Sequence, residues 1–189
     1  MATTRDRAIT ASVDLLASGG IRALTHLRVD KAAGLPRGST SNVFRTRGAL
    51  LRGVCEHMVA GERPEIDTGF AAATPEELTE SLIALYRFMT GPSRSRTAAR
   101  LALIVEGGHD EAVRAALATG RVGVERAILP PLVTLGAPDP LLAVQLIATC
   151  FEGLFLHEIG RHGSVDADAV IAATVRTIFS PARLTEAST

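Results

Sequence analysis

The sequence contains few aromatic residues and few cysteines, and these shortages narrow the classes of protein to which it can belong. It has no tryptophan, one tyrosine and six phenylalanines. Its core must therefore be built mainly from Leu, Ala, Val and Ile, a composition that favours helices packed on small side chains. The two cysteines, Cys55 and Cys150, stand without a CxxC pair or a neighbouring histidine cluster. We therefore expect neither a disulfide framework nor a zinc site.

Segments that would direct the chain to a membrane or mark an enzyme are also missing. The first seven residues form no apolar targeting segment, and no apolar run approaches the length that crosses a bilayer. There is no GxSxG elbow, GxGxxG turn or Walker loop. His157 and His162 would lie about 140° apart around a helix, not on one face as a helical zinc motif requires. These absences predict a cytoplasmic protein that is not an enzyme, without a metal, a cofactor or a membrane partner.

The net charge is zero, which taken alone argues against a nucleic-acid partner. The charge is, however, unevenly distributed along the chain. Residues 1–63 hold 10 Lys and Arg against 5 Asp and Glu, a net charge of +5, whereas residues 64–189 hold 10 against 15, a net charge of −5. A positive N-terminal segment on an acidic body is the distribution expected if only the first part of the chain meets phosphates.

Residues 25–47 lie within the positive segment and are predicted to form a helix-turn-helix. Thr25 can cap the first helix, Gly34 can adopt a positive φ at the turn, and Pro36 suits the start of the second helix. Residues 37–42 include no large apolar side chain. They offer a guanidinium, hydroxyls and an amide, which are groups that bind base edges and phosphates. By itself this pattern also fits an ordinary corner between two surface helices.

The flanking segments supply the rest of a small helical domain. Residues 5–18 have apolar side chains at helical spacing that can cover the helix pair, and two glycines end this first helix. Leu27 and Val43 are predicted to belong to the core between these helices. A fourth helix is expected to begin after Thr46 and to stop at Pro64.

The remainder of the chain is predicted to be helical as well. Thr74 and Glu77 fit a capping box at the start of one helix. Pro130 and Pro131 are expected to kink or end a long helix, because both lack an amide donor. The last two helices, from residue 140 to residue 179, carry more apolar side chains than the surface of a monomer suits. They predict a two-fold dimer interface.

These patterns predict an all-α protein. Residues 1–47 are expected to form a three-helix, helix-turn-helix DNA-binding domain, followed by a linker helix over 47–63. Residues 64–189 are expected to form a helical domain for ligand binding and dimerisation.

A set of aromatic, apolar and charged residues in this second domain fits the lining of a small-molecule cavity. Aromatic and Met side chains at helical spacing fit plain core equally well, and each charged residue also fits an ordinary surface position. The predicted lining residues are Tyr86, Met89, Leu103, Glu106, Arg121, Glu125, Phe151 and Phe155.

A single pattern runs through residues 5–51, where the amphipathic helix is followed by Gly20, Thr25, Val29, Ala33-Gly34-Leu35, Gly38-Ser39-Thr40, Phe44 and Leu50-Leu51. This pattern resembles the N-terminal module of the tetracycline-repressor-like (TetR) transcription regulators. The resemblance implies a homodimer whose recognition helices enter successive major grooves of a palindromic operator, with a ligand-binding core between the linker helix and the middle helices. The chain departs from the family at Ser41, where a Tyr that contacts the DNA backbone is usual, and at Asp30, where a small Ala is common.

Residues and resemblance together predict a ligand-responsive, sequence-specific DNA-binding regulator. We expect a repressor that a small-molecule effector releases from double-stranded DNA, and a homodimer formed through the C-terminal helices. Two alternatives are a small-molecule-binding enzyme or carrier with a structural N-terminal domain, and a helical protein-interaction module. Neither accounts for the charge split. The predicted DNA contacts are Arg37, Ser39, Ser41 and Asn42 at or beside base edges, and Thr25, Thr40, Thr46 and Arg47 at phosphates.

Overall fold

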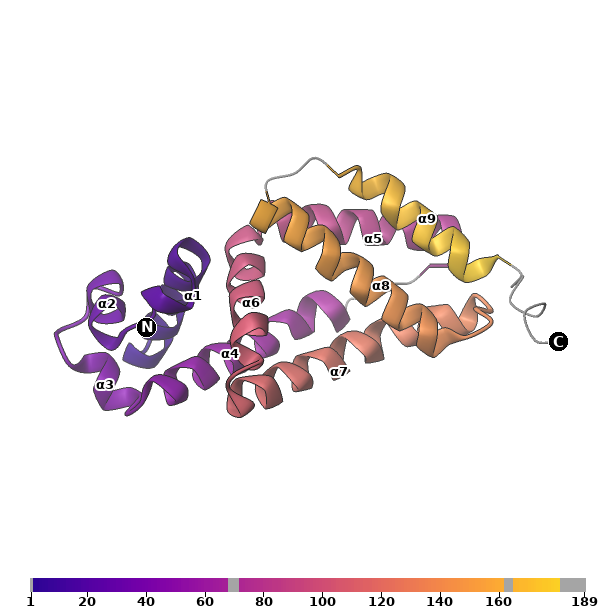
Figure 1. Ribbon diagram of the computed structural model, residues 1–189. Helices are drawn as coiled ribbons and strands as arrows, with labels where there is room; N and C mark the ends of the chain where they lie inside the picture. The colour runs from indigo at the N-terminus through magenta and orange to yellow at the C-terminus, as the bar shows by residue number, and fades with distance from the viewer. Residues whose placement is uncertain (1, 68–71, 162–164, 181–189) are drawn as a thin grey trace. The chain divides into compact units, whose positions relative to one another are not determined.

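The computed structural model describes residues 2–67, 72–161 and 165–180, and its regular structure there is helical throughout (Figure 1). The all-α prediction is therefore confirmed. The helices of the described part are α1 (Thr4–Ala23), α2 (His26–Ala32), α3 (Ser39–Val43), α4 (Arg47–Asp67), α5 (Pro75–Thr90), α6 (Arg94–Gly107), α7 (Glu111–Thr134), α8 (Pro140–Phe155), the π-helical turn η1 (Leu156–Arg161) and α9 (Ala167–Phe179).

The helices divide between two compact units. The first unit comprises Met1–Asp67 and Met89–Gly123, and the second comprises Thr68–Phe88 and Val124–Thr189. The domains predicted from the sequence divide the chain by function, whereas these units are defined by compactness. The predicted domain boundaries therefore stay a prediction.

Local capping signals in the sequence mark the starts of several helices. The Glu77 N–H donates to the Thr74 hydroxyl at 3.2 Å, and the Glu77 carboxylate accepts from the Ala73 N–H at 2.8 Å. The first bond is the predicted cap from Thr74, whereas the second differs from a capping box, in which the glutamate accepts the N–H of the capping residue itself. Asp139 and Asp166 cap α8 and α9, and each accepts the amide three residues further on at 3.0 Å. Short-range side-chain chemistry therefore sets these boundaries.

The prolines interrupt the helices less than predicted. α4 continues past Pro64 to Asp67, so the prediction that it stops at Pro64 is wrong. α7 contains both Pro130 and Pro131 and runs on to Thr134. All three prolines lie within the last two turns of their helices. Each lacks a backbone N–H, but only a few helical hydrogen bonds follow it before the helix ends, so little is lost.

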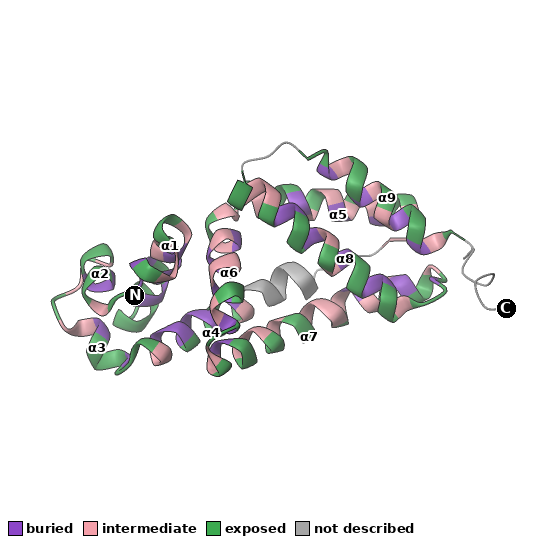
Figure 2. Cartoon of the chain, in the orientation of Figure 1, coloured by how far each residue is buried: buried purple, intermediate pink, exposed green. Residues whose placement is uncertain are grey.

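The core of the first unit forms where α1 packs against α2, α3, α4 and α6. Figure 2 shows buried positions on α1, α4 and α6 alternating with exposed ones, as expected for helices that present one face to a core. The completely or almost completely buried apolar side chains here include Leu16, Leu24, Leu50, Val54, Leu103 and Val113.

Cys55 belongs to the same core and is a fully buried, free cysteine. Burial, followed by the nearby charges of Glu56 and Asp110, raises the pKa of its thiol to about 11. The thiolate is the reactive form of cysteine, so Cys55 is chemically quiet at neutral pH.

In the second unit α8 packs against α9, and an exposed ion pair joins α5 to α9. In that ion pair Arg87 Nη2 lies 2.5 Å from Asp168 Oδ2. Figure 2 shows both buried and exposed positions along α8 and α9. The buried apolar side chains of this unit include Leu78, Leu82, Leu132, Ile147, Phe151, Leu154, Phe155, Ile171 and Val175.

One helix is apolar over a length that could cross a membrane, contrary to our reading of the sequence. The helical stretch Pro140–Arg161 has 22 residues and a mean hydropathy of 1.5 in its most apolar window. A core helix of a soluble protein passes the same test of length and composition, so this finding is weak evidence for a membrane span. Ile147, Phe151 and Leu154 of this stretch are buried within the second unit. We therefore interpret it as a core helix.

Candidate nucleic-acid interface

Helix α2 begins as the sequence predicts. The Thr25 hydroxyl accepts the Arg28 N–H at 3.3 Å and so caps the first turn. Val29 is fully buried, whereas Arg28 and Lys31 on the same helix are exposed. The helix thus anchors one face in the core and leaves cationic side chains on the other.

The turn after α2 depends on a glycine and on an arginine from α1. Gly34 has a φ of 61°, the left-handed conformation that glycine adopts at little cost. Arg7 Nη2 donates to the carbonyl oxygens of Ala33 at 2.7 Å and Gly34 at 3.0 Å. These bonds satisfy carbonyl groups that the end of the helix leaves free.

Helix α3 begins later than the sequence suggests. It starts at Ser39, with Gly38 as its N-cap at a φ of 93°, and Pro36 and Arg37 belong to the preceding turn. The prediction that the second helix starts at Pro36 is therefore wrong. The start is displaced because Asp30 of α2 accepts the backbone amides of Gly38 at 2.7 Å and Thr40 at 2.8 Å.

The other end of α3 is fixed by two residues from neighbouring helices. His26 Nε2 lies 2.7 Å from the carbonyl oxygen of Phe44, and because that oxygen can only accept, Nε2 carries the proton. The Phe44 ring is buried, and the Arg5 guanidinium carbon lies 5.3 Å from the ring centroid. α3 is therefore held at both ends by contacts with other helices.

Most of the predicted DNA-contact residues are exposed around α3. The Ser41 hydroxyl donates to the Gly38 carbonyl at 2.8 Å, and the Thr46 hydroxyl accepts the Ala49 amide at 3.0 Å. Ser39 is half-buried. The exposed members of the predicted set are Thr25, Arg37, Ser41, Asn42, Thr46 and Arg47.

Thr40 differs from the rest of the predicted set. Its side chain is fully buried and its hydroxyl donates to Asp30 Oδ1 at 2.5 Å. A hydroxyl committed to a buried carboxylate has no free donor for a phosphate. We therefore assign Thr40 a positioning role in place of the phosphate contact.

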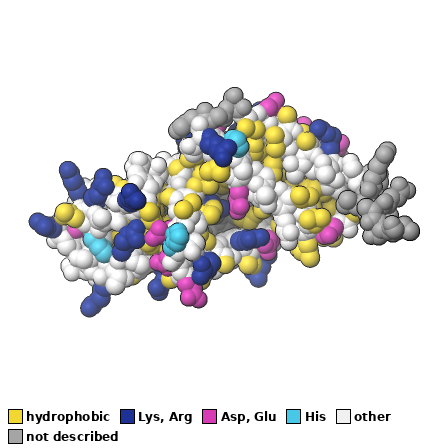
Figure 3. All heavy atoms as spheres, viewed as in Figure 1, with side chains coloured by type: hydrophobic (Ala, Val, Ile, Leu, Met, Phe, Trp, Pro, Cys, Tyr) yellow, Lys and Arg dark blue, Asp and Glu magenta, His cyan; other side chains and the backbone are white. Residues whose placement is uncertain are grey.

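The surface around α3 also contains cationic residues that sequence reasoning missed. Arg28, Lys31 and Arg45 are exposed on α2 and in the turn after α3. Figure 3 shows Lys and Arg side chains gathered over the part of the first unit formed by α1, α2 and α3. The positive charge of residues 1–63 was the signal that could have identified them, because a phosphate-binding surface uses cations on several elements.

Two apolar residues that we predicted to lie in the core are on this surface. Leu27 is 56% exposed and Val43 is 38% exposed. Because α2 and α3 are short and buried on one face only, the positions facing outward stay accessible whatever their chemistry. An exposed apolar side chain beside cationic ones is suited to contact a thymine methyl group.

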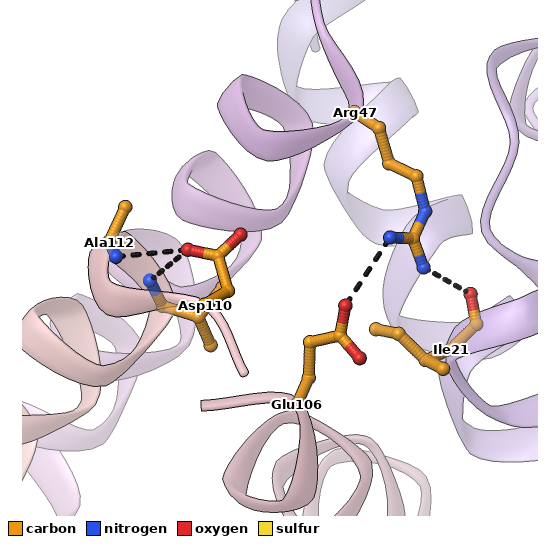
Figure 4. A network of polar contacts seen from close by, with 6 residues as sticks. Ile21, Arg47, Glu106, Asp110 and Ala112 are labelled. Atoms are coloured by element: carbon orange, nitrogen blue, oxygen red, sulfur yellow. Dashed lines mark hydrogen bonds and ion pairs between the residues drawn. The ribbon is translucent and has the colours of Figure 1, made fainter. Parts of the chain in front are cut away.

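Arg47 joins three elements of the first unit (Figure 4). Its Nη2 donates to the Ile21 carbonyl at 3.0 Å, and its Nη1 lies 3.3 Å from Glu106 Oε1 at the end of α6. Three residues after the end of α6, Asp110 caps α7 by accepting the Ala112 amide at 2.9 Å. The predicted phosphate-binding arginine is thus paired with a carboxylate in this conformation.

The predicted ligand-lining residues fall into different parts of the structure. Tyr86, Phe151 and Phe155 pack together in the second unit, with ring centroids 5.6 to 6.3 Å apart. Glu125 belongs to the same unit. The other members of the set belong to the first unit: Met89, Leu103, Glu106 and Arg121.

Within the first unit, Leu103 and the backbone of Met89 already have structural roles. Leu103 is fully buried in the core, and the Met89 carbonyl accepts the Thr97 hydroxyl at 2.7 Å. In the second unit, Phe151, Leu82 and Cys150 border a small void. This void has no room for a water molecule. The three packed rings are the part of the predicted lining that the structure brings together.

The chain is similar to several known proteins. Residues 73–181 match the family model described as the tetracyclin repressor-like C-terminal domain. No curated protein matches the sequence. A putative transcriptional regulator from Streptomyces coelicolor A3(2) is similar at 25% identity, with a TM-score of 0.69 over 94% of this chain and 99% of that chain.

Two further solved structures are similar in fold. A transcriptional regulator from Rhodococcus sp. RHA1 has 15% identity and a TM-score of 0.82 over 93% of this chain and 96% of that chain. The multidrug binding protein EbrR, solved in complex with ethidium, has 22% identity and a TM-score of 0.72 over 95% of this chain and 100% of that chain.

Proposed function

Because the chain belongs to the tetracycline-repressor-like (TetR) family of transcriptional regulators, we propose that it represses genes by binding a palindromic operator as a homodimer. A small organic molecule then releases it from the DNA. The chain is a regulator and not an enzyme, as its family indicates. The observation that carries the proposal is the helix-turn-helix of α2 and α3, whose outward face presents cationic and hydrogen-bonding side chains.

The proposed DNA contacts follow from exposure. Arg37, Ser39, Ser41 and Asn42 lie in or just before α3 and are assigned to base edges or adjacent positions. Thr25, Thr46 and Arg47 are assigned to phosphates. To these we add the three exposed cations near α3, which are Arg28, Lys31 and Arg45.

The proposed homodimer rests on large apolar side chains exposed on α8 and α9. Leu141 is 66% exposed, and Leu142, Leu146 and Val170 are exposed as well. Covering such a surface with a second copy removes apolar area from water, and a two-fold arrangement pairs the same surface on both protomers. A homodimer also supplies the two recognition helices that a palindromic operator requires.

Release by a small molecule is supported by the relative EbrR, whose structures contain ethidium and proflavin. A ligand changes DNA affinity only if it prefers the conformer that binds DNA poorly. Glu106 lies in the last turn of α6, so a shift of that turn would change the ion pair with Arg47.

Selection of random DNA duplexes on the purified protein, at two salt concentrations, tests the proposed function. We expect an enriched palindrome whose half-sites are centred about 10 base pairs apart, or a multiple of that spacing. The variant Arg37→Ala should still enrich a palindrome but should lose the preference at one position of each half-site. Recovery of no motif, with affinity equal for selected and random duplexes, would contradict sequence-specific binding.

The ion pair of Arg47 provides a second prediction. Glu106→Gln should raise affinity for operator and random DNA alike, by up to about fivefold at low salt, which is the upper range for a surface ion pair; here the Arg47 side chain is about half exposed. The reason is that Arg47 no longer has to leave a carboxylate in order to bind a phosphate. Fluorescence anisotropy with labelled duplexes measures the change.

The control for this prediction is Glu111→Gln, which removes one exposed negative charge at the start of α7. It separates the local effect on Arg47 from the general gain in positive charge. A loss of affinity in Glu106→Gln would mean that Glu106 holds Arg47 in the orientation that binds DNA.

A further inference from the structure

Helix α3 is too short to define its own start. It has five residues, and the unfavourable nucleation of a helix is recovered only over many more. Its N-cap residue, Gly38, has no side chain to accept a backbone amide. The first turn must therefore be fixed by a group from elsewhere in the chain.

Asp30 of α2 is that group. Its Oδ2 accepts the Gly38 N–H at 2.7 Å, and its Oδ1 accepts both the Thr40 N–H at 2.8 Å and the Thr40 hydroxyl at 2.5 Å. The side chain is only 3% exposed. Both carboxylate oxygens are thus committed to the start of α3, and water has little access to compete.

The charge of Asp30 agrees with this arrangement. Burial opposes ionisation, but the bonds from Thr40 and Gly38, together with the nearby His26, outweigh it and hold the pKa of Asp30 below its ordinary value. The carboxylate is therefore ionised at neutral pH. Hydrogen bonds to an ionised acceptor are stronger than those to a neutral one.

An ionised carboxylate just behind a DNA-facing helix has an electrostatic cost. It lowers the positive charge near the phosphates, so a neutral residue of the same size would favour binding to any duplex. The contribution of Asp30 must therefore come from geometry and not from attraction.

We propose that Asp30 is a positioning residue for sequence recognition, which fixes the start of α3 and so aims the side chains from Arg37 to Asn42 without itself touching DNA. The proposal rests on the proposed DNA-binding function. Its consequence is that Asp30 contributes to the difference between operator and random DNA, and not to overall affinity.

The decisive variant is Asp30→Asn, which keeps the size of the side chain but places an NH₂ donor against N–H donors. Operator affinity should fall by about tenfold or more, because at least one charge-assisted bond is lost. Affinity for random DNA should stay unchanged or rise, because a negative charge is removed. The operator is the duplex that the wild-type protein selects, and anisotropy gives both dissociation constants.

The matched control is Asp14→Asn, which removes an exposed negative charge from α1. Its affinities for the two DNAs should change by the same small factor. If Asp30→Asn lowers both affinities equally while remaining folded by circular dichroism, or leaves their ratio at the wild-type value, the proposal is wrong.

Thr40 provides a second pair of variants for the case in which Asp30→Asn does not fold. Thr40→Val removes the donated hydroxyl at constant shape, whereas Thr40→Ser retains it. We expect Thr40→Val to lose severalfold in operator affinity relative to Thr40→Ser. Equal operator affinities for these two variants would overturn the proposal.

Amide hydrogen exchange, measured without DNA, tests whether Asp30 fixes the start of α3 independently of the proposed DNA-binding function. The Gly38 and Thr40 amides should exchange at least about tenfold faster in Thr40→Val and Asp30→Asn than in the wild type, because their acceptor is weakened. If the wild type showed no sequence preference, the proposed function would fail, and exchange at these amides would still show whether Asp30 fixes α3. Unchanged exchange would refute that role.

Discussion

Phe151→Ala should lower the free energy of unfolding by about 3 to 5 kcal/mol, the range for truncating a buried aromatic side chain. Phe151 packs edge-on against Tyr86 and Phe155, with ring centroids 6.3 and 5.6 Å away, and all three rings are buried. Removing one ring eliminates two aromatic contacts and leaves a void that the neighbours fill only partly. Urea unfolding followed by circular dichroism, at fixed protein concentration, measures the loss.

This experiment also distinguishes the two interpretations of the aromatic residues. The control Phe88→Ala truncates an exposed ring on the same unit and should cost much less. A loss below about 1 kcal/mol for Phe151→Ala would mean that the ring borders open space, as in a ligand cavity. In that case the cavity interpretation would be favoured over plain core.

Gly53→Ala should also destabilise the protein, by about 1 to 3 kcal/mol, the range for overpacking a core. A methyl group at this position of α4 would lie 2.6 Å from Phe44 Cε1 and 3.2 Å from Cζ. Alanine within a helix is ordinarily favoured over glycine by about 1 kcal/mol, so the sign of the effect is reversed here. Thermal unfolding of the two proteins measures the difference.

The control for Gly53→Ala lies on the same helix. At Gly48 the nearest atom to an added methyl group is Thr46 Oγ1 at 4.0 Å, which is ordinary contact. Gly48→Ala should therefore leave stability unchanged or raise it slightly. If Gly53→Ala is as stable as Gly48→Ala, then the Phe44 ring moves aside without cost. Our description of its packing would then be wrong.

The sequence predicted the features that depend on neighbouring residues. Thr25 caps α2, Gly34 takes the left-handed conformation at the turn, and Thr74 with Glu77 caps α5. The two caps each join residues three positions apart, and Gly34 can take its conformation because it has no side chain. The TetR resemblance of residues 5–51 is supported independently by the family match over residues 73–181.

The features that the sequence did not predict depend on contacts between different helices and on which face of a helix is buried. The start of α3 is set by Asp30, which we had noted only as an unusual residue in a packed helix. The pairing of Arg47 with Glu106 joins residues 59 positions apart. Helical periodicity also cannot show which apolar side chain of a two-turn helix faces outward, which explains the error at Leu27.

The dependence of α3 on Asp30 limits how a DNA specificity can be transplanted. Grafting residues 37–44 of this chain into a relative with alanine at the position of Asp30 would leave the Gly38 and Thr40 amides without their acceptor. A portable module must therefore include α2 as well as α3.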